Sequence, residues 1–424
     1  MKKLFLILFL LLLFGFGGYF IYINYFKDVG IIPEEEFVSV SEYYIYGDHL
    51  NIKGSLEIDD MSYSELYLNL YNGEDNNLEV VSSNDGTKIE FYFSDKINDG
   101  FHLDTLERDT YYLFLKLVYD NPENEEEPII KYYSLSNNTD YKETVYYTMS
   151  MYDNKIIIDS VNKYNTMAFN VKENTDKNIY DITIDPGHGG MDSGGVSGSH
   201  YESKYTMLVS NRIKEKLEEN NFTVKLTHDD GELSNSELLD EYNKGGRAVI
   251  PNEVKSKYTF SIHFNKNAYK SVSGIEVYTA ANINYDFAKS LANTVVDNTD
   301  LNYSTNKLYK MFNGVYTRNF TEDDIADSLS GYEDKGYKPY NVSIKSNYYY
   351  MIRETGGYMT GAYIDDSNVD KVGFNPYYNS NIANETYLLE LGYLSNSSDL
   401  SIITEETEAI ADAVANAIVA KFTK

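Results

Sequence analysis

The chain has 424 residues, and Asp and Glu outnumber Lys and Arg by 66 to 36, which gives a formal net charge of −30. This balance argues against nucleic acid as a partner, because binding a phosphate backbone needs clustered Lys and Arg. Cysteine is absent, which excludes disulfides, a thiol nucleophile, thiolate-bound zinc and lipid attachment through cysteine. Carboxylates and the six histidines are therefore the residues left to hold a metal.

The N-terminal segment is apolar. Two lysines precede an almost unbroken apolar run from Leu4 to Phe26. As a helix this run would be about 35 Å long, which exceeds the roughly 30 Å hydrocarbon core of a bilayer. We therefore expect a membrane anchor over residues 1–27, with the lysines on the cytoplasmic side and the rest of the chain outside. A cleaved signal peptide with a small-x-small site at 15–17 is the alternative, and both interpretations export the protein.

A charged linker over residues 28–37 leads into a β-rich stretch. From residue 38 to residue 170, short alternating segments rich in Tyr, Ile, Val and Leu are separated by turn pairs such as Asn72-Gly73. This spacing predicts an all-β, immunoglobulin-like sandwich. We interpret its many tyrosines as strand-forming residues rather than sugar-stacking platforms. No catalytic cluster is apparent there, and His49 and His102 are expected to be ordinary structural histidines.

The pattern changes after Tyr180, where strands alternate with helices. Tyr205, Val209, Ile213 and Leu217 recur at four-residue steps, which is typical of an amphipathic helix. The expected strands cover 181–185, 222–227, 258–263, 274–279 and 387–393, and the expected helices cover 203–220, 285–299 and 405–422. This alternation predicts an α/β domain over 180–424, with a mostly parallel sheet and flanking helices. Residues 303–385 form a loop-like insertion, expected to be a lid or a substrate-binding element.

Four polar residues fall at or near the ends of these expected strands: His188, Glu202, His263 and Glu390. Ligands of α/β sheets bind beyond the carboxyl ends of the strands. Two imidazoles and one carboxylate, with water in the fourth position, form a catalytic zinc site. A second carboxylate is then needed as general base, and Glu390 is the candidate because its apolar strand makes a carboxylate costly to bury without a role. Each residue alone fits a packing or capping role, whereas the four together indicate a zinc hydrolase.

The motifs around these residues resemble those of a known family, the zinc-dependent N-acetylmuramoyl-L-alanine amidases of type 3. The segments that carry the resemblance are Ile-Asp-Pro-Gly-His-Gly-Gly at 184–190, Tyr-Glu-Ser-Lys at 201–204, Arg247 to Asn252, Ser-Ile-His-Phe-Asn at 261–265 and Glu-Leu-Gly-Tyr-Leu-Ser-Asn at 390–396 with Asp399. The resemblance implies that His188, Glu202 and His263 bind Zn²⁺ and that Glu390 activates a water. It also implies a substrate, the amide between N-acetylmuramic acid and L-alanine in peptidoglycan.

Several positions depart from the family pattern or compete with this assignment. Pro251 replaces the usual alanine and follows two glycines, so we expect a broken helix there. By resemblance Arg353 would contact a carboxylate of the stem peptide, with a structural ion pair as the alternative, and Asn265 is a second candidate substrate contact. Less favoured residues are His200 and His228 as rival ligands and Glu354 and Glu385 as rival bases.

The sequence thus predicts a membrane-anchored, extracytoplasmic cell-wall hydrolase, or a secreted one if the first segment is cleaved. Its expected partners are peptidoglycan and the membrane, with a protein activator left open and nucleic acid excluded. Two other functions stay open: a non-catalytic wall-binding or regulatory protein on the same fold, and a zinc peptidase that cuts within the stem peptide.

Overall fold

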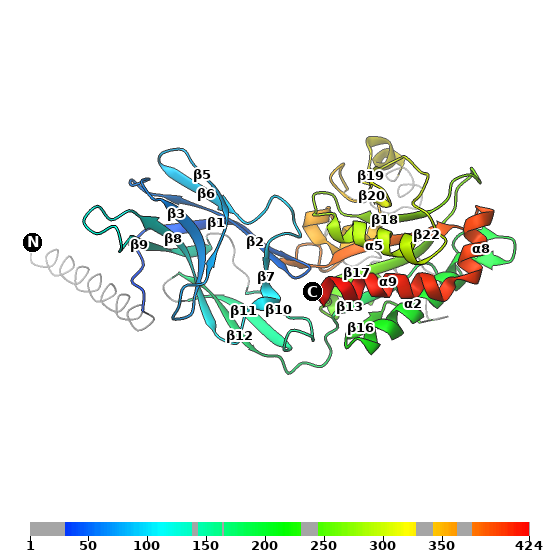
Figure 1. The fold of residues 1–424 in the computed structure, drawn as a ribbon, viewed down its shortest axis with the longest axis horizontal. Coiled ribbons are helices and arrows are strands. Elements are labelled where there is room, and N and C mark those ends of the chain that lie inside the picture. Colours follow the sequence, from blue (N-terminus) through cyan, green and yellow to red (C-terminus); the bar gives the residue numbers. More distant parts are fainter. Residues whose placement is uncertain are drawn as a thin grey trace, which may run out of the picture.

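The computed structural model describes residues 30–137, 143–162, 165–229, 245–327, 342–362 and 375–423. Figure 1 shows two parts side by side along the long axis: a β region, residues 37–173, and an α/β region, residues 182–423. The anchor predicted over residues 1–27 lies outside the described residues. Within the described ranges, none of the helices has both the length and the apolar character needed to cross a membrane.

The β region consists of strands and one short 3-10 turn, Leu103–Thr105. Its strands are β1 (Phe37–Tyr46), β2 (His49–Glu57), β3 (Glu65–Tyr71), β4 (Asn77–Leu78), β5 (Val81–Asn84), β6 (Lys88–Tyr92), β7 (Phe101–His102), β8 (Thr110–Tyr119), β9 (Ile129–Asn137), β10 (Val145–Tyr147), β11 (Lys155–Val161) and β12 (Met167–Glu173). The main path of pairing runs β10-β11-β12-β8-β9-β1-β2-β6-β5. Because this is one continuous hydrogen-bonded network, pairing alone does not divide the strands into the two sheets of a sandwich. The immunoglobulin-like arrangement therefore stays a prediction.

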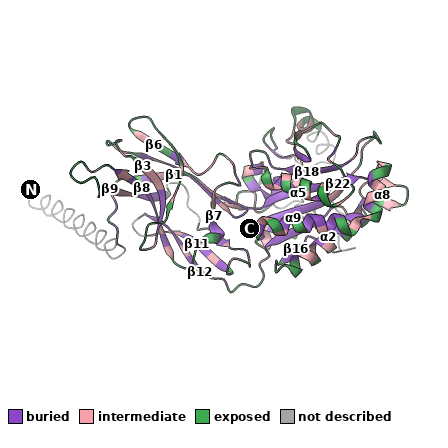
Figure 2. Ribbon diagram, viewed as in Figure 1, coloured by how far each residue is buried: buried purple, intermediate pink, exposed green. Residues whose placement is uncertain are grey.

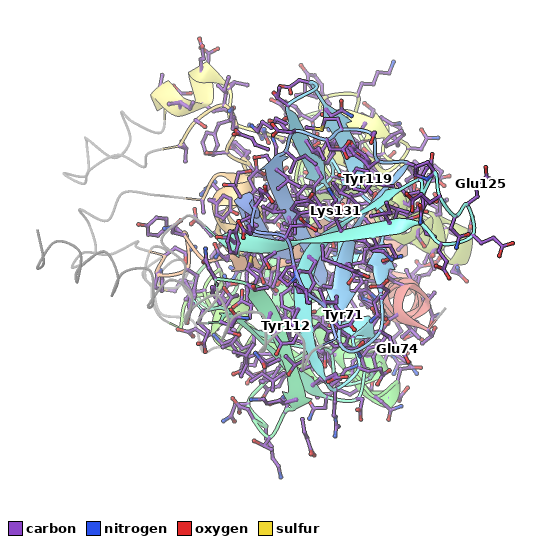
Figure 3. The ribbon with its side chains drawn as sticks, turned by 90° about the vertical axis from the view of Figure 1, so that its left-hand side faces the viewer. Tyr71, Glu74, Tyr112, Tyr119, Glu125 and Lys131 are labelled. Carbon is purple, nitrogen blue, oxygen red and sulfur yellow. The ribbon has the colours of Figure 1, made fainter. Side chains whose placement is uncertain are left out.

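Several tyrosines lie in the strands of the β region, and Figure 3 labels three of them, Tyr71, Tyr112 and Tyr119. Tyr71 and Tyr119 are buried, and the ring of Tyr132 lies 6.4 Å from the ring of Tyr71 in an edge-to-face arrangement. Edge-to-face aromatic pairs stabilise packed interiors. Tyr71 and Tyr132 therefore pack against each other, and Tyr119 packs against Tyr63 in the same way.

A seven-stranded mixed sheet forms the centre of the α/β region, in the order β16-β13-β17-β22-β18-β20-β19. Its strands are β13 (Ile182–Pro186), β16 (Val224–Leu226), β17 (Tyr258–Asn265), β18 (Ile275–Thr279), β19 (Lys310–Phe312), β20 (Val315–Thr317) and β22 (Glu385–Tyr393). The four strands β16, β13, β17 and β22 run parallel, and β18 is antiparallel to β22. Parallel pairing brings the carboxyl ends of β13, β17 and β22 to one edge of the sheet.

Helices flank this sheet. They are α2 (Glu202–Glu219), α4 (Ile250–Glu253), α5 (Asp286–Asn298), α7 (Tyr350–Thr355), α8 (Ser397–Glu405) and α9 (Thr407–Phe422), with a 3-10 turn at Gly357–Thr360. Helix α2 buries Tyr205, Val209, Ile213 and Leu217, the four residues of its predicted apolar stripe, as Figure 2 shows for the inward side of the helix. Helix α9 packs against both α2 and α5. Near Pro251 the chain forms only the four-residue α4, which fits the predicted broken helix.

The insertion at 303–385 is more ordered than its loop-like sequence suggests. Strand β20 pairs in parallel with β18 and so extends the main sheet. Helix α7 follows later in the insertion, and the short strand β21 (Ile382–Ala383) lies near its end. Outside the insertion, the short hairpin of β14 (Val196–Ser197) and β15 (His200–Tyr201) precedes α2. The insertion therefore contributes both to the sheet and to the walls beside it.

The β region and the α/β region are joined by strand pairing and by buried polar contacts. Strand β21 pairs in parallel with β1, so Ile382 lies opposite Ile45. The Tyr258 hydroxyl at the start of β17 donates to Oδ1 of Asp48 at 2.6 Å. At the start of β22, the Asn98 side-chain amide donates to Oε1 of Glu385 at 2.8 Å. Two strands of the central sheet therefore begin at the junction with the β region.

Candidate metal centre

The turn after β13 brings His188 beside β17. His188 has a φ of 63°, in the left-handed region. A Cβ atom at Gly187 would lie 2.5 Å from Cε1 of His263, and one at Gly194 would lie 2.5 Å from Cδ2 of His188. Both distances are far below van der Waals contact. The glycines of this motif are therefore needed because the two imidazoles approach the backbone so closely.

Three side chains meet at the carboxyl edge of the sheet. Oε1 of Glu202, the first residue of α2, lies 3.1 Å from Nε2 of His188 and 3.1 Å from Nδ1 of His263. The two imidazole rings are 5.0 Å apart and nearly perpendicular. The potential ligand atoms of all three residues lie within 4.8 Å of one another. The structure therefore brings together the three residues predicted to bind a metal.

Neighbouring groups fix the orientation of these side chains. Nδ1 of His188 lies 2.6 Å from a carboxylate oxygen of Asp192, which turns Nε2 toward Glu202. Glu202 accepts backbone hydrogen bonds from Gly195 at 2.7 Å and Phe264 at 3.0 Å. Hydrogen bonds of this kind set the tautomer and direction of metal-binding side chains.

The local charges favour an ionised carboxylate beside the imidazoles. Burial opposes ionisation of Glu202, but the hydrogen bonds from His188 and His263 outweigh it and hold the pKa of Glu202 far below its ordinary value. Burial lowers the pKa of His263, while the carboxylates of Glu202 and Asp192 overcome burial and raise the pKa of His188. A divalent cation would replace the proton shared in this group, because it needs neutral imidazoles and an ionised carboxylate.

Glu390 lies beside this group on β22, where it is paired in register with His263 of β17. Burial raises the pKa of Glu390 well above its ordinary value, and the charges of Glu202 and Glu276 raise it further. Its Oε2 atom is buried, and no described residue donates a hydrogen bond to it. A buried carboxylate oxygen without a hydrogen-bond donor is costly. This oxygen is therefore a candidate to accept a proton from a water or to contact a substrate.

A cleft of about 630 Å³ opens over these four residues. One wall comes from β17 and the residues after it, and the other comes from the insertion. The residues of the insertion that line the cleft are Phe320, Asp324, Asp327, Val342, Tyr348, Tyr349, Tyr350 and Arg353. The insertion therefore faces the candidate metal centre.

Residues 182–420 match a family model described as N-acetylmuramoyl-L-alanine amidase. The chain belongs to this amidase family. The match covers the α/β region, including the three potential ligands and Glu390. Membership of the family therefore rests on the α/β region of the chain.

Individual relatives match over shorter stretches. The chain is 29% identical to the "Probable cell wall amidase LytH" of Staphylococcus aureus over 132 residues, which is 30% of this chain and 40% of that protein. The chain thus spans less than half the length of the curated relatives it matches. Two similar solved structures are the amidase AmiC2 of Nostoc punctiforme and the catalytic domain of CwlV from Bacillus (Paenibacillus) polymyxa var. colistinus. Each is 20% identical to this chain, with a TM-score of 0.36. The match to AmiC2 covers 58% of this chain and 98% of the AmiC2 chain, and the match to CwlV covers 57% of this chain and 98% of the CwlV chain.

The two candidate substrate contacts both line the cleft but are bonded within the protein. Nε of Arg353 donates to Glu354 at 2.9 Å, and its Nη1 donates to two backbone carbonyls. This is the structural ion pair that the sequence left open as an alternative. The side-chain amide of Asn265 donates to Oε2 of Glu276 at 3.3 Å. Their contacts with substrate stay predictions.

The residues that the sequence analysis favours less as ligands or bases occupy other positions. Nδ1 of His200 lies 2.6 Å from the Tyr205 hydroxyl, and Nε2 of His228 lies 2.8 Å from the Pro186 carbonyl oxygen. Glu385 lies at the junction with the β region. None of them, and not Glu354, belongs to the group that His188, Glu202 and His263 form among the described residues.

Two further residues of the family motifs have structural partners. Arg247 forms a buried pair with Asp185, with Nε 2.8 Å from Oδ1, and this pair stabilises the turn before His188. Burial opposes ionisation of Asp185, but Arg247 outweighs it and lowers the pKa of Asp185 to about 2. Oδ1 of Asn252 accepts a hydrogen bond from Asn384 at 3.3 Å.

The sequence analysis missed Glu276, which is fully buried on β18 directly opposite Glu390. The signal that singled out Glu390, a carboxylate in an apolar strand, is present in Ile275–Thr279 as well. Glu276 therefore carries the same local sequence signal as Glu390. The neighbouring Tyr349, on the insertion, carries no local signal at all.

Proposed function

We propose that the chain is a zinc-dependent amidase that cleaves the bond between N-acetylmuramic acid and L-alanine in peptidoglycan. The observation that supports this most strongly is the convergence of two imidazoles and a carboxylate beside the unpartnered Oε2 of Glu390. Membership of the amidase family supports the substrate class.

The residues present fit Zn²⁺. Two nitrogen donors and one carboxylate with an open position make a typical catalytic zinc set, and the hydrogen bond from His188 to Asp192 is a typical supporting contact. His188, Glu202 and His263 would hold the ion. When bound, zinc would polarise the scissile carbonyl and lower the pKa of a water toward about 7.

Glu390 supplies the proton transfer. Burial raises the pKa of Glu390 above its ordinary value, which favours a carboxyl group that can hold a proton between two transfers. As general base, Glu390 takes a proton from the attacking water, and as general acid it returns that proton to the leaving amine. The buried surroundings keep the carboxyl group in place for both transfers.

The first test compares Glu390→Ala with His188→Ala in the full chain. Glu390→Ala should retain zinc and lose cleavage, whereas His188→Ala should lose both, because only the second variant removes a ligand. The measurements are metal content and release of free stem peptides from purified cell walls. His200→Ala is the matched control, since this imidazole lies outside the group and should leave both unchanged. Full cleavage by Glu390→Ala would refute the role of Glu390.

Mass spectrometry of the products distinguishes the competing functions. An amidase leaves a new N-terminus on L-alanine and an unmodified lactyl group on the sugar. A zinc peptidase leaves cuts within the stem peptide, and a wall-binding protein leaves none.

We also propose that residues 1–27 anchor the protein in the membrane, with an immunoglobulin-like β region and the amidase region outside the cell. The apolar run after the two lysines supports this orientation. Membrane fractionation of the full chain, with protease added to intact cells, tests both points. Recovery of a shortened chain in the medium would favour a cleaved signal peptide.

A further inference from the structure

Lys266 follows β17 directly, so its backbone lies next to the candidate metal centre. Two residues earlier, the backbone N–H of Phe264 donates to Oε1 of Glu202 at 3.0 Å. A Cβ atom at Gly195 would lie 3.2 Å from Oε2 of Glu202 and 3.5 Å from Cβ of Lys266. The side chain of Lys266 therefore begins beside the carboxylate of the metal centre, and its flexible four-carbon stem gives the ammonium group a wide reach from there.

Lys266 is a cation among the acidic residues that line the cleft. The carboxyl groups along the cleft are those of Glu202, Asp324, Asp327 and Glu390. Arg353 lines the cleft as well, but its Nε already donates to Glu354 at 2.9 Å. Among the described residues, no carboxylate pairs with the Lys266 ammonium. Lys266 therefore keeps its charge available for a ligand.

An ammonium group without a protein partner favours a carboxylate on the ligand. The chain carries a net charge of −30, so an anionic ligand meets mostly like charge as it approaches the protein. At Lys266 such a ligand finds an opposite charge and N–H donors for charge-assisted hydrogen bonds. The side chain of Lys266 is exposed, so its flexible stem can follow a flexible peptide.

The position of Lys266 indicates which part of the substrate carries that carboxylate. In the proposed function, the scissile amide lies at the metal centre. A peptide chain advances by about 3.5 Å per residue, so the residue after L-alanine also lies close to the metal centre. A lysine side chain that begins beside Glu202 can reach this residue.

We propose that Lys266 binds a carboxylate on the second residue of the stem peptide, and so selects stem peptides in which this group is free over those in which it is amidated. This inference rests on the proposed function. Lys266 is thus a substrate-binding residue that sets specificity. Its role is separate from that of Glu390, because the carboxylate it binds belongs to a part of the peptide that does not react.

The test compares two N-acetylmuramoyl-L-alanyl peptides with the full zinc-loaded chain. One probe carries D-glutamate with a free α-carboxylate at the second position, and the other carries D-isoglutamine, which has a carboxamide there. The wild type should cleave the first probe with the higher kcat/KM, and Lys266→Ala should reduce this preference about fivefold, the size of a favourable exposed ion pair. Lys270→Ala is the matched control and should keep the preference, because it removes an exposed lysine of the same loop that is not among the residues lining the cleft.

Charge reversal provides a second variant. Lys266→Glu should reduce the preference below that of Lys266→Ala, because like charges repel, and high ionic strength should reduce the wild-type preference, because salt screens exposed charges. Zinc content should stay at the wild-type value in both variants. Equal losses of kcat/KM on both probes, or a wild type that cleaves both probes equally well, would overturn the inference and leave the proposed function standing. Cleavage of neither probe by the wild type would overturn the proposed function itself.

Discussion

Two groups of imidazoles and carboxylates lie near opposite ends of the same strand, β17, and they differ in which groups donate hydrogen bonds to their carboxylates. Near the carboxyl end, His263 joins His188 and Glu202. At the amino end, Tyr258 contacts a second group in the β region, formed by Asp48, His102 and Asp104, whose potential ligand atoms also lie within 4.8 Å of one another. By residue type alone, both are candidate metal sites.

Hydrogen bonding separates them. In the second group, Oδ1 of Asp48 accepts from Tyr258 at 2.6 Å and Oδ2 lies 2.8 Å from Nε2 of His102. Asp104 accepts from the Tyr146 hydroxyl at 2.6 Å and from the Met149 backbone at 3.0 Å. In both groups every carboxylate oxygen has a protein donor. In the second group, two of these donors are the hydroxyls of Tyr258 and Tyr146, which a cation would have to displace. In the first group, Oε1 of Glu202 lies beside two imidazoles that could bind the same cation. The first group lies in a cleft beside the unpartnered oxygen of Glu390.

Loss of an imidazole from the first group should have the strongest effect on the protein. His263→Ala removes a ligand from the first group, so zinc content should fall from about one ion per chain to near zero and hydrolysis should drop by at least about a thousandfold. His102→Ala removes the matching imidazole from the second group and should leave the zinc content unchanged. Metal analysis of both purified variants decides the point, and loss of zinc in His102→Ala would break the distinction.

Asp48→Ala should cost stability rather than activity. It leaves the Tyr258 hydroxyl and the His102 ring without their buried acceptor, and a lost buried charged partner typically costs about 3 kcal/mol. The free energy of unfolding from urea titrations should fall by about this amount, while zinc content stays the same. An unchanged urea midpoint would show that the junction between the two regions does not depend on this carboxylate.

The site was more predictable from sequence than its surroundings, for physical reasons. His188 follows β13, Glu202 begins α2 and His263 lies near the end of β17. The periodicity of these elements is local, and parallel pairing then brings the strand ends together without further information. Asp48 and Tyr258 are 210 residues apart in the sequence, and no local pattern around either residue indicates that they meet. The pairing of Ile45 with Ile382 is likewise set by how two folded parts meet, and local patterns do not encode that.

Asp192→Ala should have a smaller effect, on metal affinity. Its carboxylate orients His188 from the exposed side of the cleft, and loss of such a supporting contact typically weakens zinc binding by about 10- to 100-fold. Competition with a chelator of known affinity measures this shift. Asp192→Asn, which can still accept a hydrogen bond from His188, should recover much of the affinity, and equal weakening in both variants would contradict an orienting role.

The smallest expected effect concerns pH. Burial, followed by the charge of Asp48, raises the pKa of Asp104 to about 6, against an ordinary value near 3.8. The folded state therefore holds this proton more tightly than the unfolded state, so its stabilising effect is present at low pH and is lost as pH rises through about 6. Between pH 5 and pH 8 the loss amounts to about 1 kcal/mol.

Other groups at the junction of the two regions titrate as well. The contribution of Asp104 must therefore be measured as a difference in unfolding free energy between a variant and the wild type. The Asp48 carboxylate outweighs burial and raises the pKa of His102, which acts in the same direction as Asp104. Burial lowers the pKa of Lys257 to about 8, and this contribution is lost as pH falls instead. Subtracting the unfolding free energies of Asp104→Asn from those of the wild type at pH 5 and pH 8 isolates the Asp104 contribution. If this difference is the same at pH 5 and pH 8, Asp104 is ionised over the whole range. The second group would then hold an ionised buried carboxylate, as the first group does with Glu202.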